Sequence, residues 1–235
     1  MGQTISYTRP DGQTVQGYLA EPADAVLATT APGIVVIQEW WGLNDQIRSV
    51  ADTLAAQGWR ALVPDLYRGK STVEAEEANH LMTGLNFGDA AGQDVRGAVQ
   101  YLKATGSAKA GVTGFCMGGA LTLLSAVFVP ELDAACTWYG YPPLEFIDAS
   151  KITAPLMGHW ANQDEFFKIE GVDALENKLM AAKVDFEFHR YDAKHAFAND
   201  TQVGAGRLLP VLEYDPAAAK LAWERTMRFF DSQLR

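Results

Sequence analysis

Apolar runs alternate with amphipathic segments along most of the chain. Gly33–Ile37 is a continuous apolar run with the length and composition of a strand buried on both faces. Asn44–Gln57 instead carries apolar residues at helical spacing and is followed by Gly58, a common helix terminator. Strands and helices that alternate in this way build a mostly parallel sheet with helices on both faces. The pattern therefore predicts an α/β fold.

The remaining elements follow the same rules. Two short strands joined by the turn Pro10-Asp11-Gly12 open the chain, and residues 70–93 form a less regular helical excursion over the sheet. Asp215-Pro216, a pair suited to a helix start, precedes the last helix. The other expected strands are Gln3–Thr8, Thr14–Ala20, Arg60–Val63, Ala110–Gly114, Ala134–Trp138, Pro155–Gly158 and Asp185–Tyr191, and the other expected helices are Val95–Leu102 and Gly118–Phe128. No repeat, low-complexity tract or linker divides them, so residues 1–235 are expected to form a single domain.

Composition and charge narrow the classes of partner. The chain has 48% hydrophobic and 20% charged residues, an ordinary globular composition, and a formal net charge of −10. Such an acidic protein is not expected to bind nucleic acid or an anionic membrane surface. No apolar run reaches the roughly 18 residues of a membrane span, and no secretory leader opens the sequence, so a cytoplasmic protein is expected. A monomer and a homodimer are both compatible with these features.

The sequence contains two cysteines, which are too few for a disulfide framework or a zinc site. Reduced thiols are therefore expected, with no metal and no cofactor. Cys136 lies inside the apolar run Ala134–Trp138, where a small buried thiol is typical of a core. Cys116 stands in a different setting.

Cys116 is the centre of Gly114-Phe115-Cys116-Met117-Gly118, which lies between a predicted strand and a predicted helix. This is the strand–turn–helix setting of a nucleophile elbow, with cysteine in place of serine. The glycines two residues to either side let neighbouring backbone pass the strained turn without a Cβ clash. The start of the following helix favours a thiolate and leaves the Met117 N–H free for an oxyanion. Cys116 is therefore the candidate nucleophile.

A nucleophile of this kind needs a base and an acid that orients the base, and this fold supplies them in the order nucleophile, acid, histidine. Asp164 lies in a loop that follows a predicted buried strand, and its neighbour Glu165 is the alternative acid. His195 follows the strand that ends at Tyr191, at the strand end where open α/β sheets bind ligands. The predicted triad is Cys116, His195 and Asp164.

The other three histidines have simpler interpretations. His80 lies in the irregular excursion and is expected at the surface. His189 alternates within a strand and is expected to point to solvent. His159 closes a core strand near the site, where it could line the pocket, but a hydrogen-bonded structural histidine is the favoured interpretation.

Glu39 directly follows a buried strand and precedes Trp40 and Trp41. The simple interpretation is a carboxylate that accepts hydrogen bonds from backbone amides in a turn. The alternative places Glu39 in the active site and makes the Trp40 N–H the second oxyanion donor, since the loop after the third strand supplies that donor in α/β-hydrolases. Spacing alone cannot tell whether Glu39 points at Cys116.

Taken together, these motifs resemble those of the dienelactone hydrolase family. The matching stretches cover most of the chain in the same order, and they are Gln38-Glu39 with Gly42, Val63-Pro64-Asp65-Leu66-Tyr67, Gly114-Phe115-Cys116-Met117-Gly118-Gly119-Ala120, Gln163-Asp164 and His195-Ala196-Phe197. The resemblance implies an α/β-hydrolase fold with Cys116 as nucleophile, Asp164 as acid and His195 as base. It also implies that Glu39 acts as a switch, holding the resting thiol until substrate binding frees the carboxylate to ionise it. The implied oxyanion donors are the amides of Trp40 and Met117.

The sequence departs from that family where the substrate would bind. The diene-lactone enzymes grip a substrate carboxylate with arginines in the helical excursion and just after the catalytic histidine. Here no arginine lies between Arg68 and Arg96, Asn199 stands after the histidine segment, and Arg68 or Arg207 could substitute only from inward-folded loops. A more apolar pocket is expected, with candidate members that could each also be core residues, namely Trp41, Trp138, Tyr139, Trp160, Phe197 and Asn199.

The expected function is hydrolysis of small carboxylic esters or lactones through a covalent acyl-enzyme. A promiscuous esterase that also attacks thioesters or phosphotriesters would use the same residues and is the first alternative. An alternative from another class is a non-enzymatic binding or redox-sensing protein with Cys116 as a reactive thiol.

Overall fold

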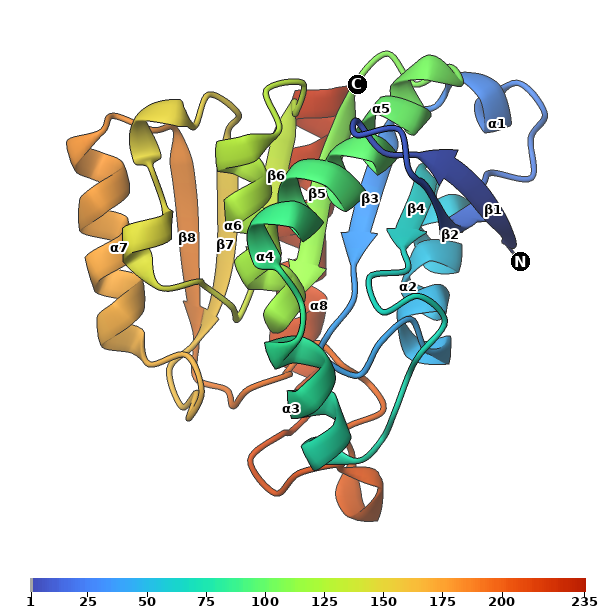
Figure 1. Cartoon of the computed structure of the whole chain (residues 1–235). Coiled ribbons are helices and arrows are strands. Elements are labelled where there is room, and N and C mark those ends of the chain that lie inside the picture. Colours follow the sequence, from blue (N-terminus) through green and yellow to red (C-terminus); the bar gives the residue numbers. More distant parts are fainter. Residues whose placement is uncertain (1) are drawn as a thin grey trace.

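The computed structural model describes residues 2–235, and its strands form one sheet of eight in the order β1-β2-β4-β3-β5-β6-β7-β8. Strand β2 is antiparallel to β1 and β4, whereas all other neighbours are parallel (Figure 1). The strands are β1 Gln3–Thr8, β2 Thr14–Ala20, β3 Gly33–Ile37, β4 Arg60–Pro64, β5 Ala110–Phe115, β6 Ala134–Trp138, β7 Leu156–Ala161 and β8 Phe186–Tyr191. The predicted mostly parallel sheet is confirmed.

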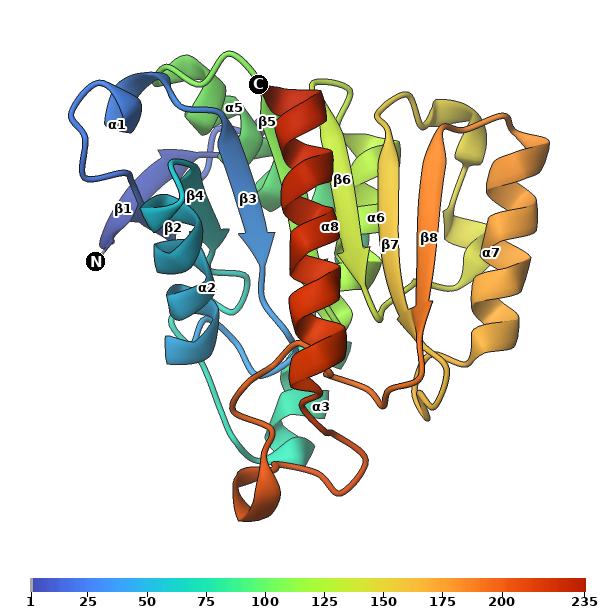
Figure 2. The same cartoon turned by 180° about the vertical axis from the view of Figure 1, so that it is seen from behind.

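Helices cover both faces of this sheet, as the alternating pattern predicted. α5 and α6 lie on the face seen in Figure 1, whereas α2 and α8 lie on the opposite face (Figure 2). The helices are α1 Leu27–Thr30, α2 Asp45–Ala56, α3 Ala75–Thr83, α4 Phe87–Asp89, α5 Arg96–Ala104, α6 Met117–Phe128, α7 Ile169–Ala181 and α8 Pro216–Leu234, with a π-helix η1 at Ala90–Val95 and short 3₁₀ turns η2 Leu144–Phe146, η3 Ala149–Lys151 and η4 Gly204–Gly206. This is the α/β-hydrolase fold.

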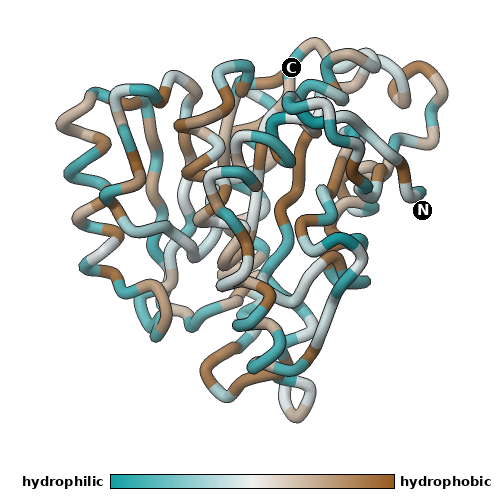
Figure 3. Tube along the Cα trace, in the orientation of Figure 1, coloured by the Kyte–Doolittle hydropathy of each residue, from teal (hydrophilic) through white to brown (hydrophobic). Residues whose placement is uncertain are grey.

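The central strands are buried along their whole length because helices pack on both of their faces. Every residue of β3, β5 and β6 is buried, which explains their continuous apolar runs. Figure 3 shows apolar residues concentrated along these strands. Edge strand β1 is mostly exposed and correspondingly polar.

Capping residues set two helix starts as expected. The Asn44 side chain accepts from the Ile47 N–H at 3.1 Å and so begins α2. Asp215 accepts from the amides of Ala217 and Ala218 and begins α8, with proline at the first helical position.

Three local features differ from the sequence-based expectation. α7 was not predicted, although its buried residues Val172, Leu175 and Leu179 recur at helical spacing. Strand β7 continues to Ala161 instead of ending at Gly158, and Pro64 is the last residue of β4 rather than its terminator. The excursion at residues 70–93 resolves into α3, α4 and most of the π-helix.

The carboxyl ends of the parallel strands meet at one edge of the sheet, at the bottom of Figure 1. α3 and the long segment that precedes α8 lie at the same edge (Figures 1 and 2). This edge is where ligands bind in open α/β sheets. Within residues 2–235, no helix combines the length and the apolar character that a membrane crossing requires.

Candidate active site

Cys116 occupies a strained turn between β5 and α6. Its φ of 56° and ψ of −118° lie outside the common regions for a residue with a side chain. A Cβ on Gly114 would collide with the Gly118 carbonyl, and one on Gly140 would collide with the Cys116 carbonyl. Glycines are therefore required where the backbone crosses this turn, and the strained strand–turn–helix geometry predicted around Cys116 is present.

Two backbone amides are available beside Cys116. Met117 is the first residue of α6, and Trp40 follows β3 by three residues. Within residues 2–235, neither of their N–H groups donates to a hydrogen bond in the protein. Both residues line the same cavity as Cys116. This is the arrangement that the predicted oxyanion donors require.

His195 is held by Asp164 in a buried pair. Asp164 Oδ2 accepts from His195 Nδ1 at 2.7 Å, and both side chains are almost fully buried, at 1% and 2% exposed. The other oxygen, Oδ1, accepts from the Phe166 and Phe167 amides at 2.8 and 2.9 Å. Glu165 is exposed, so the structure brings Asp164 and not its neighbour to the histidine.

The charges around His195 favour its protonated form. Burial opposes protonation, but the charge of Cys116 and the carboxylate of Asp164 outweigh it and raise the pKa of His195 to about 10. His195 and Cys116 line the same cavity. Because Nδ1 is occupied by Asp164, Nε2 is the ring nitrogen left to serve Cys116. The ring is also packed by Tyr139 in an edge contact at 5.1 Å between centroids.

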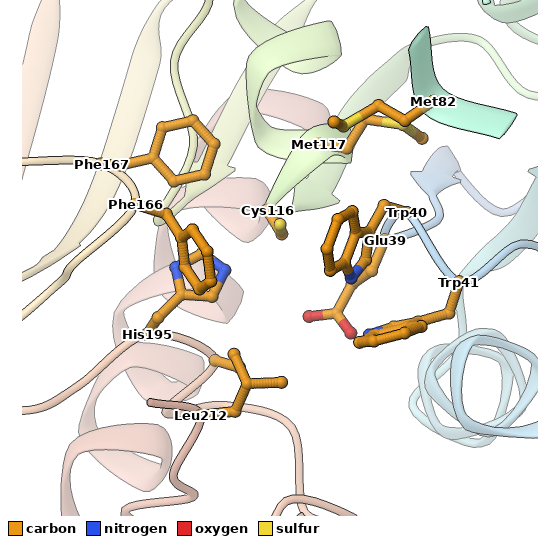
Figure 4. Close-up of a pocket in the computed structure, with 11 residues that line it drawn as sticks. Glu39, Trp40, Trp41, Met82, Cys116, Met117, Phe166, Phe167, His195 and Leu212 are labelled. Atoms are coloured by element: carbon orange, nitrogen blue, oxygen red, sulfur yellow. The ribbon is translucent and has the colours of Figure 1, made fainter. Parts of the chain in front are cut away.

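Glu39 is a buried residue of the cavity wall, and its carboxylate accepts a hydrogen bond from one side chain. Its Oε2 accepts from the Asn199 Nδ2 at 2.8 Å, and the residue is 5% exposed. Burial raises the pKa of Glu39, while the charge of His195 and the Asn199 hydrogen bond act in the opposite direction. The simple interpretation of a carboxylate bound by turn amides is wrong, since its partner among the described residues is a side-chain amide. Figure 4 shows the carboxylate pointing into the cavity below Cys116.

The candidate nucleophile, histidine and glutamate share one cavity of about 240 Å³ (Figure 4). Apart from these three residues, the wall consists of apolar side chains, namely Trp40, Trp41, Met82, Met117, Phe166, Phe167, Ala196 and Leu212. No arginine or lysine is among the residues that line it. The expectation of an apolar pocket is met, and Trp41 is part of it as predicted.

Five predicted pocket residues lie outside this cavity, so those predictions need correction. Trp138, Trp160 and Phe197 are fully buried, and Tyr139 is 1% exposed. The first two lie at the carboxyl ends of β6 and β7, but their side chains pack into the core, Trp138 against Trp223 of α8 and Trp160 against Phe188 of β8. Tyr139 contacts the His195 ring edge-on, and Phe197 packs against Tyr139. Asn199 contacts Glu39 instead of the cavity.

The sequence missed five residues of the wall, one of which, Ala196, is simply the neighbour of His195. Phe166 and Phe167 directly follow the acidic pair at 164–165, so two aromatic residues beside the candidate acid were a usable signal. Met82 comes from α3 and Leu212 from the segment before α8. Neither of those segments carries a periodic pattern that points to a pocket.

The remaining histidines and Cys136 are structural or exposed. His159 is buried, with Nδ1 bonded to the Tyr191 hydroxyl at 2.9 Å and Nε2 to the Thr226 hydroxyl at 2.8 Å, which confirms a structural role. His189 is only 14% exposed and stacks on His159, so the prediction that it points to solvent is wrong. His80 is exposed and Cys136 is buried, both as predicted.

The two arginines considered as substitutes for the family's anion-binding residues are engaged elsewhere. Arg68 Nη2 bonds to Asp94 at 2.7 Å, and Arg207 lies 3.7 Å from Glu213. Neither lines the cavity.

Comparison with known proteins agrees with this geometry. The sequence profile of the Dienelactone hydrolase family matches residues 15–234. The chain belongs to the dienelactone hydrolase family. It is 34% identical to Protein usf of Aquifex pyrophilus and 32% identical to a protein of Aquifex aeolicus (strain VF5) provisionally named carboxymethylenebutenolidase, in both cases over the full length of both chains. A crystal structure of a dienelactone hydrolase-like promiscuous phosphotriesterase from metagenomic libraries superposes with a TM-score of 0.86 at 25% identity, covering 100% of this chain and 99% of that one. The chain is thus a hydrolase of this family.

Proposed function

We propose that this protein hydrolyses small, uncharged carboxylic esters or lactones through a covalent intermediate on Cys116. The observation that carries the proposal is the meeting of Cys116, His195 and Glu39 in one apolar cavity, with Asp164 behind the histidine. Cys116 reaches it from the elbow and His195 from a loop after β8. A nucleophile, a base and an orienting acid in this order are the requirements of acyl transfer.

The resting site is expected to hold an ion pair. The raised pKa of His195 favours an imidazolium beside Cys116, and the start of α6 favours a negative charge at that position. A thiolate is the reactive form of cysteine, so a charge arrangement of this kind favours attack by Cys116.

The reaction follows from these positions. The Cys116 thiolate attacks the ester carbonyl carbon, and the electron pair of the C=O bond moves to the oxygen, which the amides of Trp40 and Met117 stabilise. Collapse of this intermediate breaks the C–O bond, and His195 gives its proton to the leaving alkoxide. Neutral His195 then takes a proton from water as the hydroxide attacks the thioester. The C–S bond of the second tetrahedral intermediate then breaks, its electron pair returns to sulfur as the thiolate, and the carboxylic acid leaves.

Glu39 lies close enough to this chemistry to act on it. The cavity brings its carboxylate to the same space as Cys116 and His195, and burial favours the protonated form. A carboxylate there can take the thiol proton when the pair is neutral, as the resemblance to the family implies. Asn199 holds the carboxylate in place through its amide.

The wall of the cavity determines which esters fit. Its apolar side chains and the nearby Glu39 carboxylate disfavour an anionic substrate, because no arginine or lysine lines it to compensate the charge. Neutral esters and lactones have a small desolvation cost on entering such a site, and burial of their apolar surface makes binding more favourable.

The test is turnover of uncharged aryl and alkyl acetates by the wild type and by Cys116→Ala and His195→Ala. Both variants are expected to retain less than about 1% of the wild-type kcat/KM, because the residues of a catalytic triad depend on one another and each variant removes one of them. Cys136→Ala, which removes the other thiol, is the matched control and keeps its activity. Retention of substantial activity by Cys116→Ala would contradict the proposal.

A second candidate activity is hydrolysis of phosphotriesters. The promiscuous phosphotriesterase that superposes on this chain favours it, and a phosphorus centre would use the same thiolate and the same donors. Comparison of kcat/KM for a phenyl ester and a neutral aryl phosphotriester ranks the two activities.

A further inference from the structure

The turn that carries Phe166 and Phe167 is fixed by the acid of the candidate triad. Both of their amides donate to Asp164 Oδ1, while Asp164 Oδ2 accepts from His195. One carboxylate therefore sets the position of the base and of two aromatic side chains in the cavity wall. The positions of these two aromatic residues and of His195 are therefore linked through Asp164.

Phe166 and Phe167 play different parts beside His195. Phe167 stacks on the histidine ring at 5.6 Å with an interplanar angle of 24°. Phe166 meets it edge-on at 5.0 Å and is 48% exposed. Leu212 lies on the same side, where it forms a strand-like bridge with His195. An exposed ring in a cavity wall gains if a ligand covers it.

The position of the proton donor indicates which part of a substrate lies beside Phe166 and Leu212. His195 Nδ1 is held by Asp164, so the proton for the leaving alcohol comes from Nε2. The leaving oxygen must then lie within hydrogen-bond reach of that nitrogen. Its substituent enters the space beside Phe166 and Leu212, across Cys116 from Trp40 and Trp41 (Figure 4).

We infer that Phe166 and Leu212 form a subsite for an aromatic leaving group, so that aryl esters are the preferred substrate class. This inference rests on the proposed ester hydrolysis. An aryl group fits because ring pairs gain more than their buried area alone provides, and because the subsite offers no charged or hydrogen-bonding side chain. Phe166 is the specificity-determining residue, since its ring is the exposed one.

The experiment compares two acetates whose alcohols have similar acidity, phenyl acetate and a fluorinated alkyl acetate. Because the two alcohols are equally acidic, the esters have similar chemical reactivity. The quantity compared is kcat/KM for phenyl acetate divided by kcat/KM for the fluorinated alkyl acetate. Phe166→Ala is expected to lower this ratio about tenfold, the effect of losing one aromatic contact and its buried area. Phe166→Tyr keeps the ring and is expected to keep the ratio. Phe146→Ala, which removes an exposed ring outside this cavity, is the matched control and leaves the ratio unchanged.

Equal losses for both esters in Phe166→Ala would overturn the inference, as would an equal change in Phe146→Ala. A second measurement does not depend on turnover. Phenyl acetate is titrated into Cys116→Ala protein with and without Phe166→Ala, and binding is followed by the change in total tryptophan fluorescence, since Trp40 and Trp41 line the cavity. The subsite predicts about tenfold weaker binding in the double variant. If the wild type turns over neither ester, the proposed function fails, while this titration still supports or overturns the aromatic subsite.

Discussion

Asn199 donates its side-chain amide to Glu39 Oε2 at 2.8 Å, although the two residues are 160 positions apart in the sequence. Asn199 is itself fixed, because its Oδ1 accepts from the Thr201 hydroxyl at 2.7 Å and from the Thr201 amide at 3.1 Å. A buried carboxylate is thereby oriented by a neutral partner. No positive side chain among the residues lining the cavity neutralises it, except His195 when protonated.

Glu39→Gln is expected to stabilise the protein at neutral pH while lowering its activity. Burial raises the pKa of Glu39 above its unfolded value, so the folded state binds more protons than the unfolded state between the two pKa values. Stability contributed by this group therefore falls as pH rises through that interval. Thermal melts of the variant and the wild type should differ near pH 7 and converge near pH 4.

Glu165→Gln is the control for that experiment, since Glu165 is an exposed neighbour of the site. Its melting temperature should follow the wild type at every pH. A Glu39→Gln protein that melts at a lower temperature than the wild type at pH 7 would contradict this prediction. It would show that interactions in the folded protein stabilise the Glu39 charge by more than its burial costs.

The alkaline limb of the pH–rate profile should report His195. Its pKa is raised to about 10 by Cys116 and Asp164 against the effect of burial, so kcat/KM should fall as the imidazolium loses its proton near pH 10. The stability that this ion pair contributes is present below the unfolded pKa of about 6.5 and is lost as pH rises through about 10.

Asp164→Asn should move that limb to lower pH and reduce kcat by at least about 100-fold, because the amide neither stabilises the imidazolium nor fixes the tautomer. Nuclear magnetic resonance titration of His195 checks the cause, since Cys116→Ala should also lower the histidine pKa. An unshifted limb in Asp164→Asn would mean that another group controls the rate at high pH.

Gly140→Ala should disrupt the elbow. A Cβ at this position would collide with the Cys116 carbonyl oxygen, which is backbone and cannot rotate away. The expected loss is about 3 kcal/mol or more in the free energy of unfolding, measured by urea titration. Gly92→Ala is the control, because the nearest atom to its new Cβ would be 3.8 Å away, an ordinary contact. Similar stability of the two variants would indicate that the elbow relaxes easily.

The preference for uncharged substrates can be tested with 4-carboxyphenyl acetate and 4-acetylphenyl acetate. The two esters have nearly the same shape, but only the first is an anion. We expect kcat/KM to be at least about tenfold lower for the carboxylate, because no arginine or lysine lines the cavity and burying an unpaired charge is costly. Equal rates would mean that a cation reaches the substrate in the complex.

The sequence predicted the strands, most helices and the four polar residues Glu39, Cys116, Asp164 and His195 that the structure brings together. These predictions succeeded because a nucleophile elbow has strict backbone requirements and because strand ends of a parallel sheet share one edge. The shape of the pocket could not be predicted in the same way. Trp138 and Trp160 stand at the carboxyl ends of two parallel strands, as pocket residues would, but their side chains pack into the core against Trp223 and Phe188.

Phe166 and Leu212 show the opposite case. They come from irregular segments whose positions depend on tertiary hydrogen bonds, such as the amides bound by Asp164 and the Glu213 amide bound by the His195 carbonyl at 3.1 Å. No local periodicity reveals such contacts. A rule that searches for aromatic residues directly after the acid would have found Phe166.

Covalent catalysis at Cys116 is tested most directly by mass spectrometry of protein quenched during turnover of phenyl acetate. The tryptic peptide of residues 110–151 contains both cysteines, so fragmentation must assign the modified residue. The account predicts an added acetyl group on Cys116, which is absent from Cys116→Ala and unchanged in Cys136→Ala. Turnover with no adduct on Cys116, or an acetyl group on a different residue that disappears at the catalytic rate, would contradict it.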